Sequence, residues 1–337
     1  MSLPVFPDGT DIDAAADALE ELEFSDGLPL VPPTEARMAA MLAGVAEPDR
    51  QLGLLPPLFG ELTPRAVAYQ CVLAGAAPDA LPVVLTAALA TLAPDFNVLG
   101  LLTTTGTPAV ATIVHGPAAD RLGMNGGANM LGPGNAANAT LGRAISLVLR
   151  NIGGAREGVG DMATMGQPGK YSFCFPEGAA PGFPSLARRR DIPEGASAVT
   201  VLGVSGTVEV LPLDDRDTPE AILSPIAAAM MAVPAVAGSG RARPPGEQVF
   251  LLPPELAAAL AKHGFGLRDV QDYLYRTERV EIPGVGAFER ASPVAAGPDA
   301  IHPIVAGGAG IKMTYLPLWA GGTRTETRAL IDLESAP

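Results

Sequence analysis

Residues 109–151 read AVATIVHGPAADRLGMNGGANMLGPGNAANATLGRAISLVLRN, and this stretch decides the fold class. It opens with Ala109 to Val114, a run with β-branched residues that is bounded by Gly116-Pro117, as is typical of a strand. It closes with residues 138–151, where apolar residues recur at the spacing of one helix face: Leu141, Ile145, Val148 and Leu149. A strand, a glycine-rich loop and a helix in succession indicate an α/β protein.

The same alternation continues on both sides of this stretch. Capping residues, Thr-Pro pairs and apolar periodicity predict helices over residues 11–23, 34–45, 63–75, 78–92, 218–232, 254–262 and 268–276. Short β-rich runs predict strands over residues 28–31, 97–104, 171–175, 248–252, 302–306, 312–316 and 325–331, and a hairpin formed by 198–203 and 207–211. We therefore expect an α/β fold, with a layered mixed sheet packed with helices, in two lobes.

A break in composition at residues 176–194 gives the expected lobe boundary. We expect residues 1–190 to form an N-terminal α/β lobe with the Gly/Asn-rich loop and residues 191–337 to form a C-terminal α/β lobe, the two making one compact unit. Hydrophobic residues are 48% and charged residues 17%, which is the composition of a folded chain. The 39 glycines and 34 prolines indicate many tight turns.

The charge balance argues against a nucleic-acid partner. The net charge is −14, whereas nucleic-acid binders carry a basic footprint. The dense basic cluster Arg188-Arg189-Arg190 is interpreted as a solvated loop or a set of salt bridges, with a clamp for an anionic ligand as the alternative.

The chain also lacks the usual marks of export or membrane insertion. Its opening, Met1 to Pro4, has no basic and apolar signal pattern, and no apolar run reaches the roughly 18 residues of a membrane helix. We expect a cytoplasmic protein without a membrane partner. Its two cysteines, Cys71 and Cys174, are then expected to be free thiols.

Residues 123–138 are the first candidate for a binding site. They hold five glycines and four asparagines, which let a backbone approach a ligand and offer amide donors and acceptors. The helix that follows would present free N–H groups to an anion. The candidate substrate-binding residues are Asn125, Asn129, Gly132, Gly134, Asn135, Asn138 and Arg143. In the alternative, this is a tight loop whose asparagines cap their own backbone.

Two further glycine observations bear on this site. Gly142 lies inside the expected helix, where it costs about 1 kcal/mol relative to alanine, so it indicates close packing or a close ligand. Gly307 to Gly310 form a second glycine loop, and we expect Gly308 to contribute to the same cleft, because loops that follow strands gather at the carboxyl ends of an α/β sheet.

Residues 166–175, GQPGKYSFCF, are the candidate catalytic segment. On a strand, Lys170, Ser172 and Cys174 would share one face and are candidates for acid–base or nucleophilic work. An edge strand with a half-buried thiol is the alternative. His115 is a fourth catalytic candidate, because it ends a strand beside Gly116-Pro117.

Several cofactor fingerprints are missing from the sequence. The three histidines and two cysteines show no metal-ligand spacing, and no phosphate loop or dinucleotide fingerprint occurs. No Gly-x-Ser-x-Gly elbow is present either, which argues against an α/β-hydrolase. We therefore expect no metal and no bound cofactor.

The chain resembles an uncharacterised bacterial family in motifs that are spread over most of its length: 26–35 (DGLPLVPPTE), 131–144 (LGPGNAANATLGRA), 166–175 (GQPGKYSFCF), 269–275 (DVQDYLY) and 305–310 (VAGGAG). The resemblance implies a small partner protein with a cysteine- or selenocysteine-Gly-Ser-Cys motif, and thiol redox chemistry. It also implies a cysteine in the Ala-Gly-x-x-Pro turn, where this chain has Ala76, and that departure favours redox-neutral chemistry.

Three functions remain open from the sequence. The first is a redox-neutral small-molecule enzyme of the lyase, hydratase, isomerase or hydrolase type, whose substrate carries a carboxylate or another anionic group. The second is a thiol-dependent component that acts with a small thiol-containing partner protein through Cys174. The third is a non-catalytic small-molecule binding protein. In each case we expect a homo-oligomer.

Overall fold

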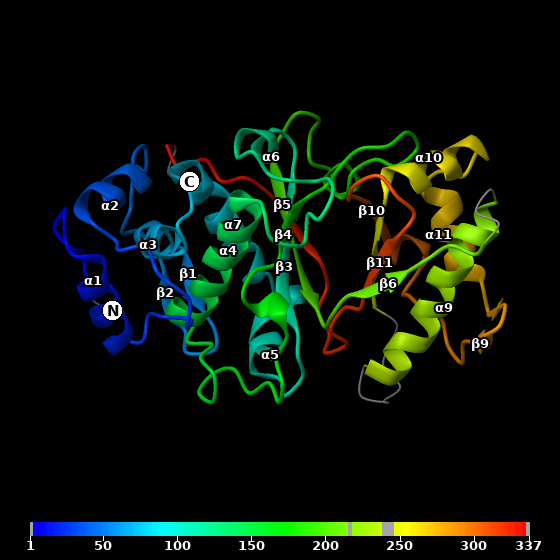
Figure 1. Ribbon diagram of the computed structural model, residues 1–337, viewed down its shortest axis with the longest axis horizontal. Coiled ribbons are helices and arrows are strands. Elements are labelled where there is room, and N and C mark those ends of the chain that lie inside the picture. Colours follow the sequence, from blue (N-terminus) through cyan, green and yellow to red (C-terminus); the bar gives the residue numbers. More distant parts are fainter. Residues whose placement is uncertain (1–2, 215–217, 238–245, 335–337) are drawn as a thin grey trace.

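The computed structural model describes residues 3–214, 218–237 and 246–334 and shows a mixed α/β protein whose mixed sheets are packed with helices. Two four-stranded sheets form its centre (Figure 1). In order across the first sheet, the strands are β12 (Glu326–Ala329), β5 (Ala198–Val204), β3 (Ala109–His115) and β4 (Cys174–Pro176). Across the second they are β10 (Ile301–Val305), β7 (Gln248–Leu252), β11 (Met313–Leu316) and β6 (Val208–Val210).

The two sheets pack face to face. Successive side chains of a strand point to opposite faces, so Ala111 and Ile113 of β3 lie on the face opposite to Val110 and Val114. The inner face of the first sheet joins one apolar cluster with the inner face of the second: Ala111, Ile113, Phe173, Phe175, Leu202 and Val204 with Val249, Leu251, Ile304 and Leu316. The remaining faces are covered by helices, which gives four layers in the order helix, sheet, sheet, helix.

The first outer layer is built around α3 (Pro64–Ala74), α4 (Leu81–Thr91) and α7 (Ala136–Leu147), with α1 (Ile12–Glu21) and α2 (Glu35–Met41) outside them. The second is built from α9 (Pro219–Ala237), α10 (Pro254–Lys262) and α11 (Leu267–Arg276). Smaller elements complete the described chain: α5 (Val98–Thr103), α6 (Pro117–Arg121), α8 (Leu186–Arg189) and the hairpins β1–β2 (Gly53–Leu55, Gly60–Leu62) and β8–β9 (Arg279–Ile282, Gly286–Glu289).

The predicted helix boundaries are confirmed where capping residues mark them. The Thr34 and Thr63 hydroxyls accept the N–H groups of Arg37 and Ala66, and Gly75 ends α3 with φ +77°. Within the described ranges, no helix is by itself long and apolar enough to cross a membrane. In these ranges, only the two helical segments 78–91 and 94–103 are together long and apolar enough, and they are bent by 77° relative to each other.

Two predicted strands are wrong. Residues 97–104 form α5, because Asn97 takes a left-handed conformation and caps the helix by accepting the N–H of Gly100. Leu101 of that helix then packs directly on Gly203. Residues 28–31 form no strand. The Arg143 side chain binds the carbonyl oxygens of Leu28 and Pro29, where a neighbouring strand would otherwise donate.

The prediction that residues 198–203 and 207–211 form a hairpin is also wrong. β5 and β6 lie in different sheets, because the chain leaves β5 at Val204, which bridges to Leu318, and β6 then pairs with β11. The sheets accordingly do not divide the chain at residue 190: both β5 and β12 follow that residue and belong to the sheet of β3.

Arg143 fastens the N-terminal segment to α7. Its Nε and Nη2 atoms donate to the two carboxylate oxygens of Asp26 at 2.9 and 2.8 Å, and both side chains are largely buried. Burial alone raises the pKa of Asp26, but the hydrogen bonds and charge of Arg143, with the backbone N–H groups of Leu28 and Asp26, outweigh it and lower the pKa.

We expect Arg143→Ala to lower the free energy of unfolding by about 2–4 kcal/mol, because it leaves a half-buried carboxylate without its partner. Urea unfolding of Arg143→Ala, Asp26→Ala and the double variant measures this. The loss of free energy of unfolding in the double variant should be clearly smaller than the sum of the losses in the two single variants. If the losses of free energy are strictly additive, Arg143 and Asp26 do not stabilise the fold as a pair.

Candidate functional site

The asparagines of the Gly/Asn-rich loop bind the loop's own backbone. Asn125 accepts the N–H of Gly127 and donates to Ala128 O, and Asn129 donates to Pro133 O. Asn135 caps α7 by accepting the N–H of Asn138, and its amide donates to Gly123 O. The buried Asn138 accepts the N–H of Asn125 and donates to Asn125 O and Met130 O. The amides therefore hold the loop in shape.

The glycines of this loop serve close packing at some positions and a left-handed backbone at others. Gly132 lies against the Asn129 side chain, and Gly134 has φ +119°. Gly308 of the second glycine loop lies so close to Ala128 that an added Cβ would stand 2.8 Å from its Cα, and Gly307 donates its N–H to Gly126 O at 2.9 Å. The two glycine loops thus meet by direct backbone contact, and neither lines the two cavities described below.

The four candidate catalytic side chains are not brought together. His115 is buried at the end of β3, with Nδ1 at 2.8 Å from Glu177 Oε2 and Nε2 at 2.7 Å from Thr200 Oγ1. Ser172 donates its hydroxyl to Ala139 O in α7. Only Lys170 lines a large cavity.

The predicted strand of residues 171–175 is wrong in its first half, since β4 begins at Cys174 and residues 168–170 form a 3-10 turn. Close packing explains Gly142: a Cβ there would stand 2.4 Å from Ser172 Oγ and 2.7 Å from Phe173 N. Ser172 and Cys174 therefore pack directly against α7, and Cys174 is buried there.

Neither thiol of the chain is poised to react. Cys174 is 4% exposed, and burial raises the pKa of its thiol to about 12. Burial also raises the pKa of Cys71, which lies on α3 and packs in the core. A reactive cysteine needs an exposed setting that lowers its pKa, and both settings do the opposite.

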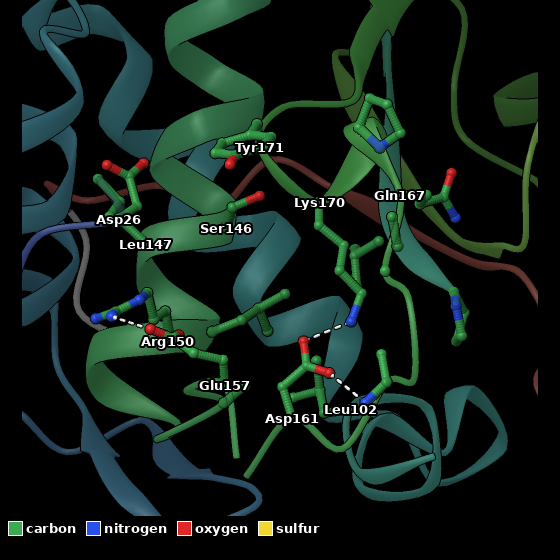
Figure 2. A pocket seen from close by; sticks show the side chains of 18 of the residues that line it. Asp26, Leu102, Ser146, Leu147, Arg150, Glu157, Asp161, Gln167, Lys170 and Tyr171 are labelled. Carbon is green, nitrogen blue, oxygen red and sulfur yellow. Dashed lines mark hydrogen bonds and ion pairs between the residues drawn. The ribbon is translucent and has the colours of Figure 1, made fainter. Parts of the chain in front are cut away.

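A cavity of about 720 Å³ lies between α7, α5 and the segment 155–171, and we call it the Lys170 cleft (Figure 2). Its apolar lining comes mainly from α5, the start of β3, and the end of α7 with the π-helical turn that follows it: Leu101, Leu102, Pro108, Ala109, Val110, Leu147 and Leu149. Its polar lining comes mainly from residues 25–27 and 157–171. The size lies within the range of small-molecule sites, which is roughly 300–1,000 Å³.

Lys170 and Asp161 form the central ion pair of this cleft. Lys170 Nζ lies 2.5 Å from Asp161 Oδ2, while Asp161 Oδ1 accepts the N–H of Ala163. Figure 2 shows the amine and the carboxylate pointing toward each other beside the apolar wall. Their side chains are 26% and 22% exposed, so both remain accessible to a ligand in the cleft.

Four more polar side chains of the lining lie near this ion pair or along the same wall. Arg150 lies 3.5 Å from Glu157 and donates to Glu23 O. Ser146 of α7 and Tyr171 present hydroxyls that have no hydrogen-bond partner in the described part of the chain (Figure 2).

The sequence prediction missed Asp161, Ser146 and Tyr171 as site residues. A usable signal was present, because Gly153, Gly154, Gly158 and Gly160 precede Asp161 and indicate a loop that folds tightly over neighbouring backbone. Ser146 is separated from Lys170 by more than twenty residues, and nothing local links the two.

Neither a scan against models of protein families nor a search of curated proteins finds a match for this chain. Among the residues that the structure describes, no three His, Cys, Asp or Glu side chains gather closely enough to hold a metal ion.

We expect the native protein to resist thiol reagents. With a pKa of about 12, roughly one Cys174 thiol in ten thousand is ionised at pH 8. Titration with Ellman's reagent should therefore show no rapid phase in the folded protein and two equivalents in guanidinium, falling to one in Cys174→Ser. A full equivalent that reacts within seconds in the native wild type, and is absent from Cys174→Ser, would contradict this assignment.

Proposed function

We propose that this protein is a redox-neutral small-molecule enzyme, of the lyase, hydratase, isomerase or hydrolase type, that acts on an anionic substrate in the Lys170 cleft. The observation that carries the proposal is the Lys170–Asp161 ion pair, which faces an open cavity with an apolar wall and two unengaged hydroxyls. A cation, a carboxylate and neutral proton donors are the groups that general acid–base chemistry needs.

The ion pair supports an exchange of partners on binding. A substrate carboxylate that enters the cleft competes with Asp161 for the Lys170 ammonium, since both are anions of similar size. Asp161 then keeps its hydrogen bond from the N–H of Ala163 and is free to accept a proton from the substrate or from a water. The proton taken by Asp161 is the one that the bound substrate or water loses, so the step needs no oxidant.

The hydroxyls of Ser146 and Tyr171 supply the complementary role. Each can donate a hydrogen bond to an oxygen on which negative charge develops, which is where preorganised donors accelerate a reaction most. The apolar wall of Leu101, Leu147 and Val110 fits the hydrocarbon part of a small organic acid and strengthens the charged contacts by excluding water.

The two alternatives differ from this proposal in what they require. The thiol-dependent function needs an accessible thiolate, and both cysteines are buried with raised thiol pKa values. The binding-protein alternative needs the cleft and its cations but no proton transfer. An experiment that separates binding from proton transfer therefore discriminates among them.

The test is hydrogen exchange with solvent, which needs no knowledge of the product. The wild-type protein is incubated in D₂O with a panel of short aliphatic, hydroxy and unsaturated carboxylates, and ¹H NMR follows both turnover and loss of the C–H signals next to the carboxylate. We expect at least one acid to react. Asp161→Asn should slow its reaction by about 10²–10⁴-fold, the usual contribution of a general base.

The variants separate positioning from chemistry. Lys170→Ala should weaken binding of the same acid about tenfold or more, because a charge-assisted hydrogen bond contributes about 1.5–3 kcal/mol. Lys312→Ala is the matched control, since Lys312 forms an exposed ion pair with Glu209 outside the cleft. An acid that binds with the same Lys170 dependence but is never turned over would favour the binding protein, and unchanged turnover in Asp161→Asn would refute the assigned base.

A further inference from the structure

A separate cavity of about 850 Å³ lies beside the second sheet, and we call it the arginine pocket. It lies where α8, the first turn of α11 and the amino ends of β7 and β10 converge, and it shares no lining residue with the Lys170 cleft. Four arginines line it: Arg189, Arg190, Arg268 and Arg324. Two of them belong to the cluster that the sequence left open between salt bridges and an anion clamp.

The lining is cationic although the whole chain is strongly acidic. Its four arginines face three carboxylates, Glu247, Asp269 and Asp299, so the lining carries 4 − 3 = +1 while the chain carries −14. A locally positive concave surface on an acidic protein concentrates small anions from solution.

The three carboxylates are already engaged. Glu247 accepts from Arg190 at 2.8 Å and from the N–H and hydroxyl of Thr325. Burial raises the pKa of Glu247, but His302, Thr325 and Arg190 outweigh it and lower the pKa to about 2. Asp269 accepts the N–H of Gly266, and Asp299 pairs with Arg268. The pocket therefore has cationic groups to spare, whereas its anionic groups are taken.

Two arginines supply that spare charge. The exposed Arg324 guanidinium has no partner in the described ranges of the chain. Arg189 is 11% exposed and donates from Nη2 to Pro303 O, but its Nε and Nη1 have no partner among the described residues. Its nearest carboxylate, Glu177 at 3.7 Å, is shared with His115 and with the N–H of Leu186. A buried cation compensated this weakly favours a nearby anion.

One more feature of the lining fits an anion. The first turn of α11, which is ten residues long, faces the pocket with Leu267, Arg268 and Asp269, and a helix amino end attracts negative charge. His302 also lines the pocket, but burial lowers its pKa and its Nε2 faces Glu247 Oε1 at 3.2 Å, so it is not a contact for the anion.

We propose that the arginine pocket binds the phosphate group of a small molecule. Several guanidinium groups around one concave site suit an oxyanion with three terminal oxygens, because each planar group can donate two parallel hydrogen bonds. Arg190, Arg268 and Arg324 are the residues that contact the phosphate, and the more buried Arg189 adds to the positive electrostatic potential of the pocket. The volume leaves room for the organic part of a phosphate ester.

Calorimetric titration of the full chain with inorganic phosphate, against sodium chloride at matched ionic strength, tests this. We expect saturable binding of phosphate in the millimolar range or tighter. Arg324→Ala should weaken it about tenfold or more, and Arg268→Ala should weaken it as well. Arg279→Ala, which removes the same charge from an exposed ion pair with Glu289 outside the pocket, should leave it unchanged.

The other outcomes overturn the proposal in distinguishable ways. The proposed site is refuted if phosphate shows no saturable binding, or if Arg324→Ala and Arg279→Ala weaken phosphate binding equally. Binding of citrate without binding of phosphate removes the phosphate assignment. Lys170→Ala should keep the affinity for phosphate, and loss of phosphate binding in that variant alone would move the anion to the Lys170 cleft. Turnover in the Lys170 cleft does not depend on any of these results.

Discussion

The face-to-face packing of the two sheets is the constraint on which the rest of this molecule depends. Ala111, Ile113 and Phe175 of the first sheet meet Val249, Leu251 and Ile304 of the second across a closed apolar layer. Since helices cover the outer faces, β3, β5, β7 and β10 are buried along their whole lengths. Polar groups that must reach a ligand are thereby excluded from the centre, and both large cavities lie at strand ends.

The same packing brings charged groups of the two sheets close to one another at the seam. Arg189 of α8 lies 3.7 Å from Glu177, which holds His115 of the first sheet, and the next residue, Arg190, binds Glu247, which holds His302 of the second. Two consecutive arginines thus lie beside two glutamate–histidine pairs, one at each sheet. Each buried charge has an opposite charge nearby, which is the condition under which ionised groups survive in a protein interior.

The parts of the fold that could be predicted are those determined by neighbouring residues. The strand Ala109–His115 and the helix starts at Thr34 and Thr63 follow from patterns a few residues long. The helical conformation of residues 97–104 and the separation of β5 from β6 depend instead on contacts between residues far apart in the sequence. Leu101 packs against Gly203, and Val204 forms a β-bridge with Leu318. For the same reason the sequence indicates Lys170 as a candidate, but only the structure shows that Lys170 pairs with Asp161 and shares a cavity with Ser146.

The Gly/Asn-rich loop shows why residue density alone did not locate the site. Glycine marks a place where something approaches the backbone closely, and that neighbour is either a ligand or another part of the chain. Here Ala128 lies against Gly308, and the Ser172–Phe173 backbone lies against Gly142. Each asparagine amide donates at least one hydrogen bond within the loop, and the buried Asn138 uses both of its amide hydrogens there, so these side chains hold the loop together. Side-chain groups that make no hydrogen bond in the described part of the chain line the two cavities: the hydroxyls of Ser146 and Tyr171 in one, the Arg324 guanidinium in the other. Polar groups without a partner beside open space, rather than unusual composition, are therefore the better physical guide to a candidate ligand site in this protein.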